Sequence, residues 1–211
     1  MNFIIIQGKK YNIDKKKIYL NWSGIHEIPD FSNFVNLQEI EMNYNSINNI
    51  SDSLCNLKSL KILCLSNNRL DFIPDSISNL NNLDKLELSY NRIRKISNAI
   101  CNLKSLTHLY LSYNNIYEIP NSISNLINLR GFELINNNIS TIPISIINLR
   151  NLNIFYYGNN PIENISLNVQ IFLDKVQNSN FYKDSENVHS NSIQKSVKES
   201  IIKILLVDYK N

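Results

Sequence analysis

A repeat of 23 residues runs through most of this 211-residue chain and constrains its fold more than any other feature. Leucines recur at this interval at Leu37, Leu60, Leu83, Leu106, Leu129 and Leu152. Each full repeat between 37 and 151 has seven apolar positions, which in one of them are Leu60, Leu63, Leu65, Leu70, Ile73, Ile77 and Leu80. A fixed period of this length indicates stacked structural units, each of which buries its apolar face against its neighbours.

One polar residue is equally regular in the repeat. It is an asparagine, found at Asn45, Asn68, Asn91, Asn114, Asn137 and Asn160. An asparagine among apolar positions needs partners for two amide donors and one carbonyl acceptor. A chain that turns at this point also leaves backbone groups that need partners. We therefore predict a structural ladder of asparagines that bond to adjacent backbone, and not a set of catalytic residues.

The repeat "LKILCLSNNRLDFIP" resembles the leucine-rich repeat pattern LxxLxLxxNxLxxIP. The 23-residue spacing with its "IP" pair is similar to the intracellular class found in Ras-associated leucine-rich repeat proteins. This resemblance covers roughly residues 15 to 165 and implies an α/β solenoid, a horseshoe with a parallel sheet on its concave side. It also implies a small GTPase, or a kinase or phosphatase assembly, as the kind of partner, and no residue chooses among these.

The repeats divide the chain into two expected parts. Residues 1–165 are expected to hold an N-terminal cap and about seven coils, of which the first and last are atypical. The segment "FIIIQGKKYNI" suggests a hairpin that turns near Gly8 and caps the first coil. Residues 166–211 are expected to form a C-terminal helical cap and tail, in which Val169, Phe172, Leu173 and Val176 share one helix face.

The convex side and the tail are expected to be less regular. Prolines share one position after the strand half of the repeat, where short helical or 3₁₀ segments should follow, at Pro29, Pro74, Pro120 and Pro143. Residues 178–191 are polar and loop-like, and residues 192–207 predict a second amphipathic helix. Lysines opposite its apolar side are typical of a membrane-surface helix, but packing on the last coil is the simpler interpretation, so we expect no membrane partner.

Two variable columns should carry the function, because they are predicted to face outward on the concave sheet. The column between the two strand leucines contains Tyr19, Glu41, Cys64, Glu87, Tyr110, Glu133 and Tyr156. The column before the asparagine contains Trp22, Tyr44, Asn67, Tyr90, Tyr113, Asn136 and Asn159. Such an aromatic and mildly acidic face is typical of protein-binding surfaces, although tyrosine also simply suits a sheet.

The charge of the chain and its distribution argue against several classes of function. The net charge of +3 and an acidic concave face argue against nucleic acid, which requires a basic footprint. Arg69, Arg92, Arg94 and Lys95 are expected at the edge beyond the asparagines, as a small basic patch or, more simply, a solvated edge. His108 is expected on the concave face near Glu87 and Glu133, as an ordinary surface histidine.

No catalytic, metal or cofactor-binding set is predicted. Four glycines leave no phosphate-binding loop, and no Ser-His-Asp set forms from neighbouring columns. Three cysteines without framework spacing favour a reducing, cytoplasmic location, and Cys64 is not expected to act as a nucleophile.

The sequence therefore predicts a monomeric, non-enzymatic module that binds a protein on its concave face. One alternative is a regulatory or docking subunit of a signalling enzyme that acts through the tail beyond residue 165. Another is a structural spacer in a larger assembly.

Overall fold

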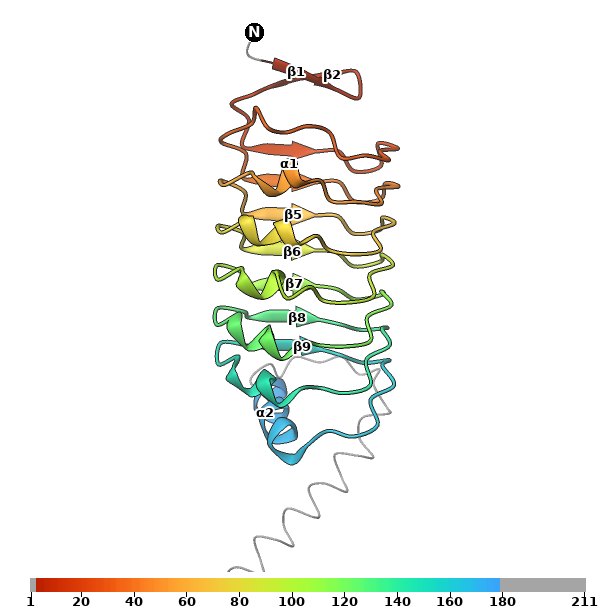
Figure 1. The fold of residues 1–211 in the computed structure, drawn as a ribbon, viewed down its shortest axis with the longest axis vertical. Coiled ribbons are helices and arrows are strands. Elements are labelled where there is room, and N and C mark those ends of the chain that lie inside the picture. The colour runs from red at the N-terminus through yellow and green to blue at the C-terminus, as the bar shows by residue number, and fades with distance from the viewer. Residues whose placement is uncertain (1–2, 179–211) are drawn as a thin grey trace, which may run out of the picture. The chain divides into compact units, whose positions relative to one another are not determined.

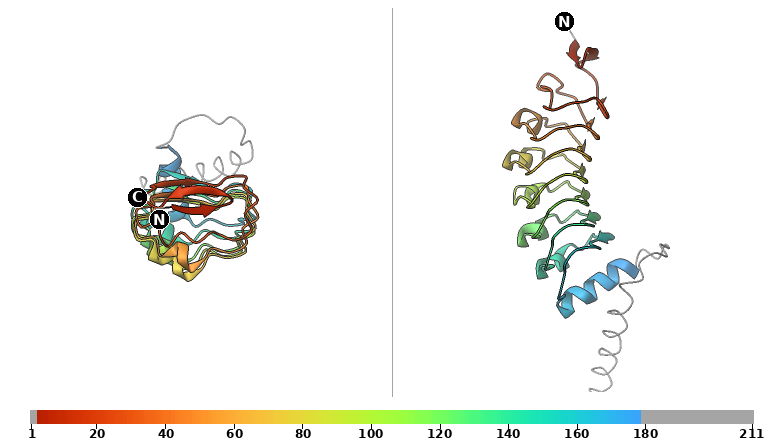
Figure 2. Two further views of the ribbon diagram at one scale, coloured as in Figure 1. Left: turned by 90° about the horizontal axis from the view of Figure 1, so that it is seen from above. Right: turned by 90° about the vertical axis from the view of Figure 1, so that its right-hand side faces the viewer.

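Parallel strands from successive repeats form one continuous sheet. The structure, a computed structural model, describes residues 3–178 and places seven strands side by side in chain order (Figure 1). These strands are β3 (Lys17–Tyr19), β4 (Glu39–Glu41), β5 (Ile62–Cys64), β6 (Lys85–Glu87), β7 (His108–Tyr110), β8 (Gly131–Glu133) and β9 (Ile154–Tyr156). The strands line the inner side of a gently curved stack of coils, and short helices lie on its outer side (Figure 2).

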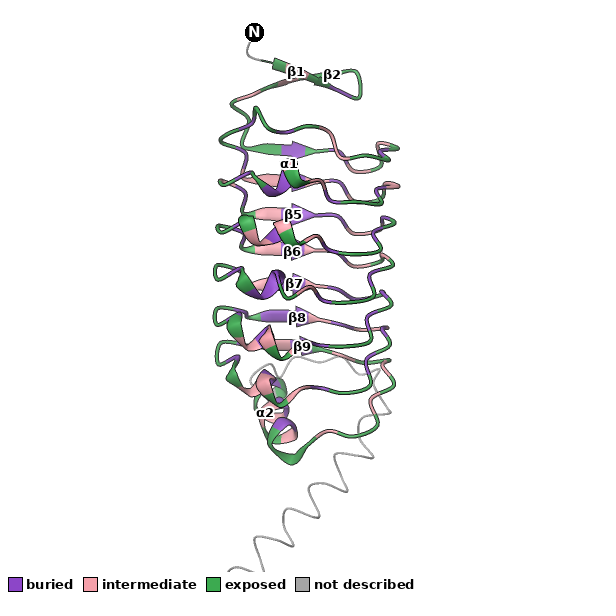
Figure 3. Ribbon diagram, in the orientation of Figure 1, coloured by how far each residue is buried: buried purple, intermediate pink, exposed green. Residues whose placement is uncertain are grey.

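The sheet register confirms that equivalent residues of the repeats lie beside one another. Leu63 pairs with Leu86, Leu86 with Leu109, and Leu109 with Phe132. All four side chains are fully buried. The central residue of every strand in this sheet is buried, and in most strands its neighbours are exposed or half-buried, whereas β5 and β8 bury one neighbour as well (Figure 3). The leucine period is thus a buried column that runs along the whole solenoid.

The first coil fills the same core with larger side chains. Phe31 and Phe34 are fully buried and meet edge to face, with ring centroids 5.8 Å apart. They lie between β3 and β4, where later repeats place isoleucine and leucine. Aromatic rings bury more surface than aliphatic side chains, so two of them compensate for the weaker repeat pattern of this coil.

The convex side carries one short helical segment in most coils. These segments are α1 (Asp52–Cys55), η1 (Asp75–Asn79), η2 (Ile100–Asn102), η3 (Asn121–Asn125) and η4 (Ile144–Asn148). Pro74, Pro120 and Pro143 directly precede three of the 3₁₀ segments, in extended backbone. Where the proline is absent, Ser51 caps α1 by accepting the Leu54 N–H at 3.4 Å.

Separate elements cover the two ends of the core. The antiparallel hairpin of β1 (Phe3–Ile6) and β2 (Lys9–Asn12) turns at Gly8, whose φ of 73° favours glycine. Ile6 of this hairpin is buried in the same core as the repeats. At the other end α2 (Leu167–Asn178) buries Val169, Leu173 and Val176, with Phe172 half-buried. The predicted hairpin and helical caps are therefore both present. The predicted loop at 178–191 and helix at 192–207 lie outside the described residues, apart from Asn178 at the end of α2.

Candidate functional site

Two rows of side chains follow the strand side of the solenoid. The strand row is the last residue of each strand, in pairing order Tyr19, Glu41, Cys64, Glu87, Tyr110, Glu133 and Tyr156. The turn row lies three residues further along each coil and comprises Trp22, Tyr44, Asn67, Tyr90, Tyr113, Asn136 and Asn159. Parallel pairing in constant register aligns the equivalent residues of each row along the solenoid.

The turn row is not part of the strands, which corrects the expected placement. All of its residues have left-handed backbone, with φ between 54° and 57°. The chain leaves the sheet here, while backbone bonds between coils continue, such as Tyr44 N–H to Ser66 O at 3.0 Å. Left-handed φ is uncommon for aromatic residues and costs about 1 kcal/mol each. The regular hydrogen bonds of the stack hold this conformation at every coil.

Four of the aromatic residues in the turn row form two parallel stacks. The rings of Trp22 and Tyr44 lie 4.0 Å apart, and those of Tyr90 and Tyr113 lie 4.2 Å apart, each pair within 8° of parallel. All four side chains remain exposed, from 43% for Tyr113 to 72% for Trp22. The repeat geometry therefore presents rigid aromatic surface to solvent, which is what a binding face requires at low entropic cost.

The strand row contains three glutamates, but part of its negative charge is neutralised by a lysine. Lys85 pairs with Glu87 of this row and lies 5.3 Å from the centre of the Tyr110 ring. Beside the row, Lys17 pairs with Glu39. Both lysines occupy the first position of a strand, outside the two columns taken from the sequence as the binding face. Alternation in the strand directs this position outward as well, so the face has a third column.

Burial changes the acid–base behaviour of the centre of this row. It raises the pKa of the half-buried Glu133 carboxyl, and the nearby Glu87 charge raises it further while Lys85 opposes both. Burial also raises the pKa of the Tyr110 phenol. Tyr110 is half-buried where an exposed ring was expected, since it lies between the side chains of Glu87 and Glu133.

Cys64 differs from its expected outward exposure, because only 4% of its surface is accessible. The shorter cysteine lies between the longer Glu41 and Glu87 of neighbouring strands. Burial raises the pKa of its thiol above the ordinary value, and the two carboxylate charges add to this effect. A thiol held in its neutral form is a poor nucleophile.

The His108 side chain contacts the residue before it and a residue of its own strand. Its Nδ1 lies 2.8 Å from Thr107 Oγ1, and its ring centre lies 6.0 Å from that of Tyr110. The strand register sets it beside Lys85 and Gly131, two residues before Tyr110, which pairs with Glu87 and Glu133. Among residues 3–178 no group of His, Cys, Asp and Glu side chains suits a metal ion.

The asparagine column joins each coil to the one before it. Asn114 Nδ2 donates to Leu88 O of the preceding coil at 3.0 Å and to Leu111 O of its own coil at 3.1 Å. Its Oδ1 accepts the Ile93 N–H of the preceding coil at 3.0 Å. The same set of bonds recurs at the other members, Asn45, Asn68, Asn91, Asn137 and Asn160. These side chains lie directly after the turn row and fix its position.

Comparisons with known proteins agree with this repeating geometry. Residues 59–116 match the family described as leucine rich repeat. A leucine-rich repeat protein of Leptospira interrogans superimposes with a TM-score of 0.72 at 28% identity, over 76% of this chain and 41% of its own. An internalin of Listeria monocytogenes gives 0.66 at 27% identity, over 72% of this chain and 44% of its own.

The fold is a leucine-rich repeat solenoid. A further similar structure is the leucine-rich repeat ectodomain of the Arabidopsis thaliana receptor kinase GASSHO1/SCHENGEN3, solved in complex with Casparian strip integrity factor 2. It aligns with a TM-score of 0.59 at 27% identity, over 64% of this chain and 17% of its own. The chain thus spans less than half the length of these three structures. A search of curated proteins gave no match.

Two hollows lie away from the two rows of this leucine-rich repeat solenoid. One, of about 520 Å³, is lined by Asp71, Phe72, Ile73, Arg94, Lys95, Ser97 and Tyr117. It brings part of the expected basic edge together with exposed rings, since Lys95 lies 5.3 Å over the Tyr117 ring. The sequence interpretation left this apolar component out.

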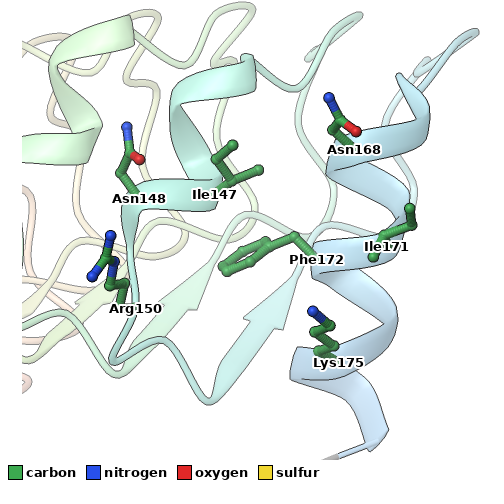
Figure 4. A pocket seen from close by; sticks show the side chains of 7 residues that line it. All are labelled: Ile147, Asn148, Arg150, Asn168, Ile171, Phe172 and Lys175. Carbon is green, nitrogen blue, oxygen red and sulfur yellow. The ribbon is translucent and has the colours of Figure 1, made fainter.

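The second hollow lies between the last coil and the C-terminal helix α2. It measures about 400 Å³, and Ile147 of η4 and Phe172 of α2 approach each other at its centre (Figure 4). Arg150 and Lys175 lie at its border. Of the helices in the described range, none has the length and apolar character needed to cross a membrane.

Proposed function

We propose that this chain is a non-enzymatic recognition module that binds a protein partner across its strand row and turn row. The observation that carries this proposal is the pair of exposed aromatic stacks, each held by the left-handed backbone of the solenoid. Rigid aromatic side chains lose little freedom on association, and they supply the large contact area that dominates binding energy at interfaces.

The half-buried acidic strand row supports the same proposal. Glu41 and Glu133 are not in an ion pair among residues 3–178, so they are available to a basic surface. Charge of one sign beside aromatic anchors selects among partners by electrostatic complementarity. The leucine-rich repeat receptor ectodomain described above was solved with a bound protein factor, which is a precedent for this use of the fold.

The test is capture of a partner by the tagged chain, followed by identification of what is retained. Replacing Tyr90, Tyr110 and Tyr113 together by alanine should abolish retention while the thermal melt remains cooperative. Tyr117→Ala is the matched control, because Tyr117 is 43% exposed like Tyr113 but lies at the lateral hollow. Retention that survives the triple change would refute binding at this face.

The same experiment separates the alternative in which the tail docks a signalling enzyme, such as a small GTPase, kinase or phosphatase assembly. A chain that ends at residue 178 keeps α2 and therefore keeps the capped core. Recognition by the two rows requires this shortened chain to retain the partner as well as the full chain does. Loss on shortening, with retention by the triple alanine variant, would assign the function to the tail.

We further propose a cytoplasmic, monomeric protein. The support for a reducing compartment is that Cys55, Cys64 and Cys101 are all unpaired and buried. Light scattering of the purified chain should give the mass of one copy, 24.5 kDa.

A further inference from the structure

The turn row is interrupted once between its two aromatic stacks. Asn67 lies between Tyr44, which ends the first stack, and Tyr90, which begins the second. Adjacent rings within each stack are 4.0 and 4.2 Å apart, one coil step each. Tyr44 and Tyr90 are two coil steps apart, which corresponds to about 8–10 Å. We call the space between these two rings, above Asn67, the turn-row slot.

Asn67 fills only the base of this slot. Its side chain ends at the amide, whereas a tyrosine ring extends well beyond the same distance from the backbone. We therefore expect the outer parts of the Tyr44 and Tyr90 rings to face each other with no ring of the turn row between them, and both side chains are exposed. Within residues 3–178 no hydrogen bond joins the side-chain amide of Asn67 to another group, whereas Asn136 Oδ1 accepts one from Asn159 Nδ2 at 3.1 Å. The base of the slot thus offers a free donor and acceptor.

The charges beside the slot favour a cation. Glu41 and Glu87 belong to the two coils that carry Tyr44 and Tyr90. Both carboxylates act on Cys64, which lies between them in the coil of Asn67. Glu87 is partly neutralised by Lys85, whereas the Glu41 carboxylate has no ion pair among residues 3–178 and accepts a hydrogen bond from Asn21 Nδ2 at 2.8 Å. The local field is therefore negative.

We infer that the turn-row slot binds the guanidinium group of an arginine side chain from the protein partner. A planar group at the centre of the slot lies about 4–5 Å from each ring, close to the spacing that the stacked pairs already adopt. Guanidinium is planar and cationic, stacks on aromatic faces, and presents donors that suit Asn67 Oδ1. A lysine ammonium lacks the plane. This inference rests on the proposed function, because it assigns partner chemistry to one position of the same face.

The substitution Asn67→Tyr tests the slot without removing any ring. Four positions of this row already hold Trp or Tyr at φ of 57°, so the backbone accepts the new side chain. The added ring joins the two stacks into one and fills the slot. Asn136→Tyr is the matched control, because it lengthens the second stack beyond Tyr113 and leaves the slot open. Asn67→Phe gives a second filling variant, and thermal melts verify that each variant folds.

The readout is the tyrosine ring resonances of the ¹³C-labelled protein during titration with N-acetyl-arginine amide. The Tyr44 and Tyr90 signals should shift and saturate, and N-acetyl-lysine amide should bind about tenfold more weakly. The Asn67→Tyr and Asn67→Phe variants should lose these shifts, and the Asn136→Tyr variant should keep them.

Four results would overturn the inference. The first three are the absence of saturable shifts at Tyr44 and Tyr90, an equal response to the lysine probe, and shifts that persist when Asn67 is replaced by Tyr or Phe. The fourth is tighter binding of N-acetyl-tyrosine amide, since the slot would then select a neutral ring. None of these results tests the proposed binding face itself. That proposal is refuted only if the triple alanine variant still retains the partner.

Discussion

Replacing Asn114 by alanine should destabilise the solenoid more than any surface change, because this side chain joins two coils in a buried position. The substitution removes acceptance of the Ile93 N–H and donation to the Leu88 and Leu111 carbonyls. The Ile93 N–H is then left without a partner, which costs about 1–3 kcal/mol. The two carbonyls still accept from Asn91 and Asn137, so the lost bonds to them add only about 1 kcal/mol, and a total loss of about 2–4 kcal/mol is expected. That is a large share of the roughly 5–15 kcal/mol that stabilises a typical domain.

Urea denaturation followed by circular dichroism measures this loss. Asn115→Ala is the control, since Asn115 is the next residue, is exposed, and should change stability by less than about 0.5 kcal/mol. Asn91→Ala removes the same kind of bonds at a half-buried position, where water compensates in part, so about 1–3 kcal/mol is expected. A loss below about 1 kcal/mol for Asn114→Ala, with an unchanged denaturant slope, would refute the role of the ladder.

Three further predictions concern the strand side and the thiols. The raised pKa of Glu133 means that the folded state prefers its protonated form, so stability is lost as pH rises through that pKa. Glu133→Gln should therefore raise the melting temperature at pH 7, with the gain vanishing under acidic conditions where the carboxyl is protonated; an equal gain at every pH would contradict this. Gly131→Ala sets a Cβ 2.8 Å from the His108 ring, so it should lower the melting temperature by a few degrees, and adding His108→Ala should restore most of the loss; no rescue would reject the clash. Thiol titration with Ellman's reagent should be slow for the native protein and reach three thiols only on unfolding, whereas rapid native labelling would contradict the burial of Cys55, Cys64 and Cys101.

The repeat period predicted the core because burial follows directly from apolar spacing. The columns that contain Leu63 and Leu65 are buried at every coil where the pattern is complete, and the register of the sheet follows from the constant period. The caps were also predictable, since Ile6 and Val169 belong to apolar patterns at the two ends of the repeats. The buried columns recur in every repeat, so a correct prediction for one coil also predicts the others.

The details of the candidate site depend on geometry that apolar spacing does not encode. The residue type of Tyr90 and Tyr113 predicts neither their left-handed backbone nor the stacking of their rings. Cys64 was assigned outward by alternation, but its accessibility is set by the length of its neighbours and not by its own direction. The pairing of Lys85 with Glu87 likewise depends on side-chain conformation, since alternation directs both residues outward but does not show that they meet.

The bonds of the asparagine column run within a coil or to the coil before it, and this has a mechanical consequence. A pulling force applied at the two ends is carried by every coil-to-coil junction in series, and each junction can open by itself because Asn114 and its equivalents join nothing more distant. The solenoid should then extend in a series of similar small steps under load, like a spring whose turns open singly.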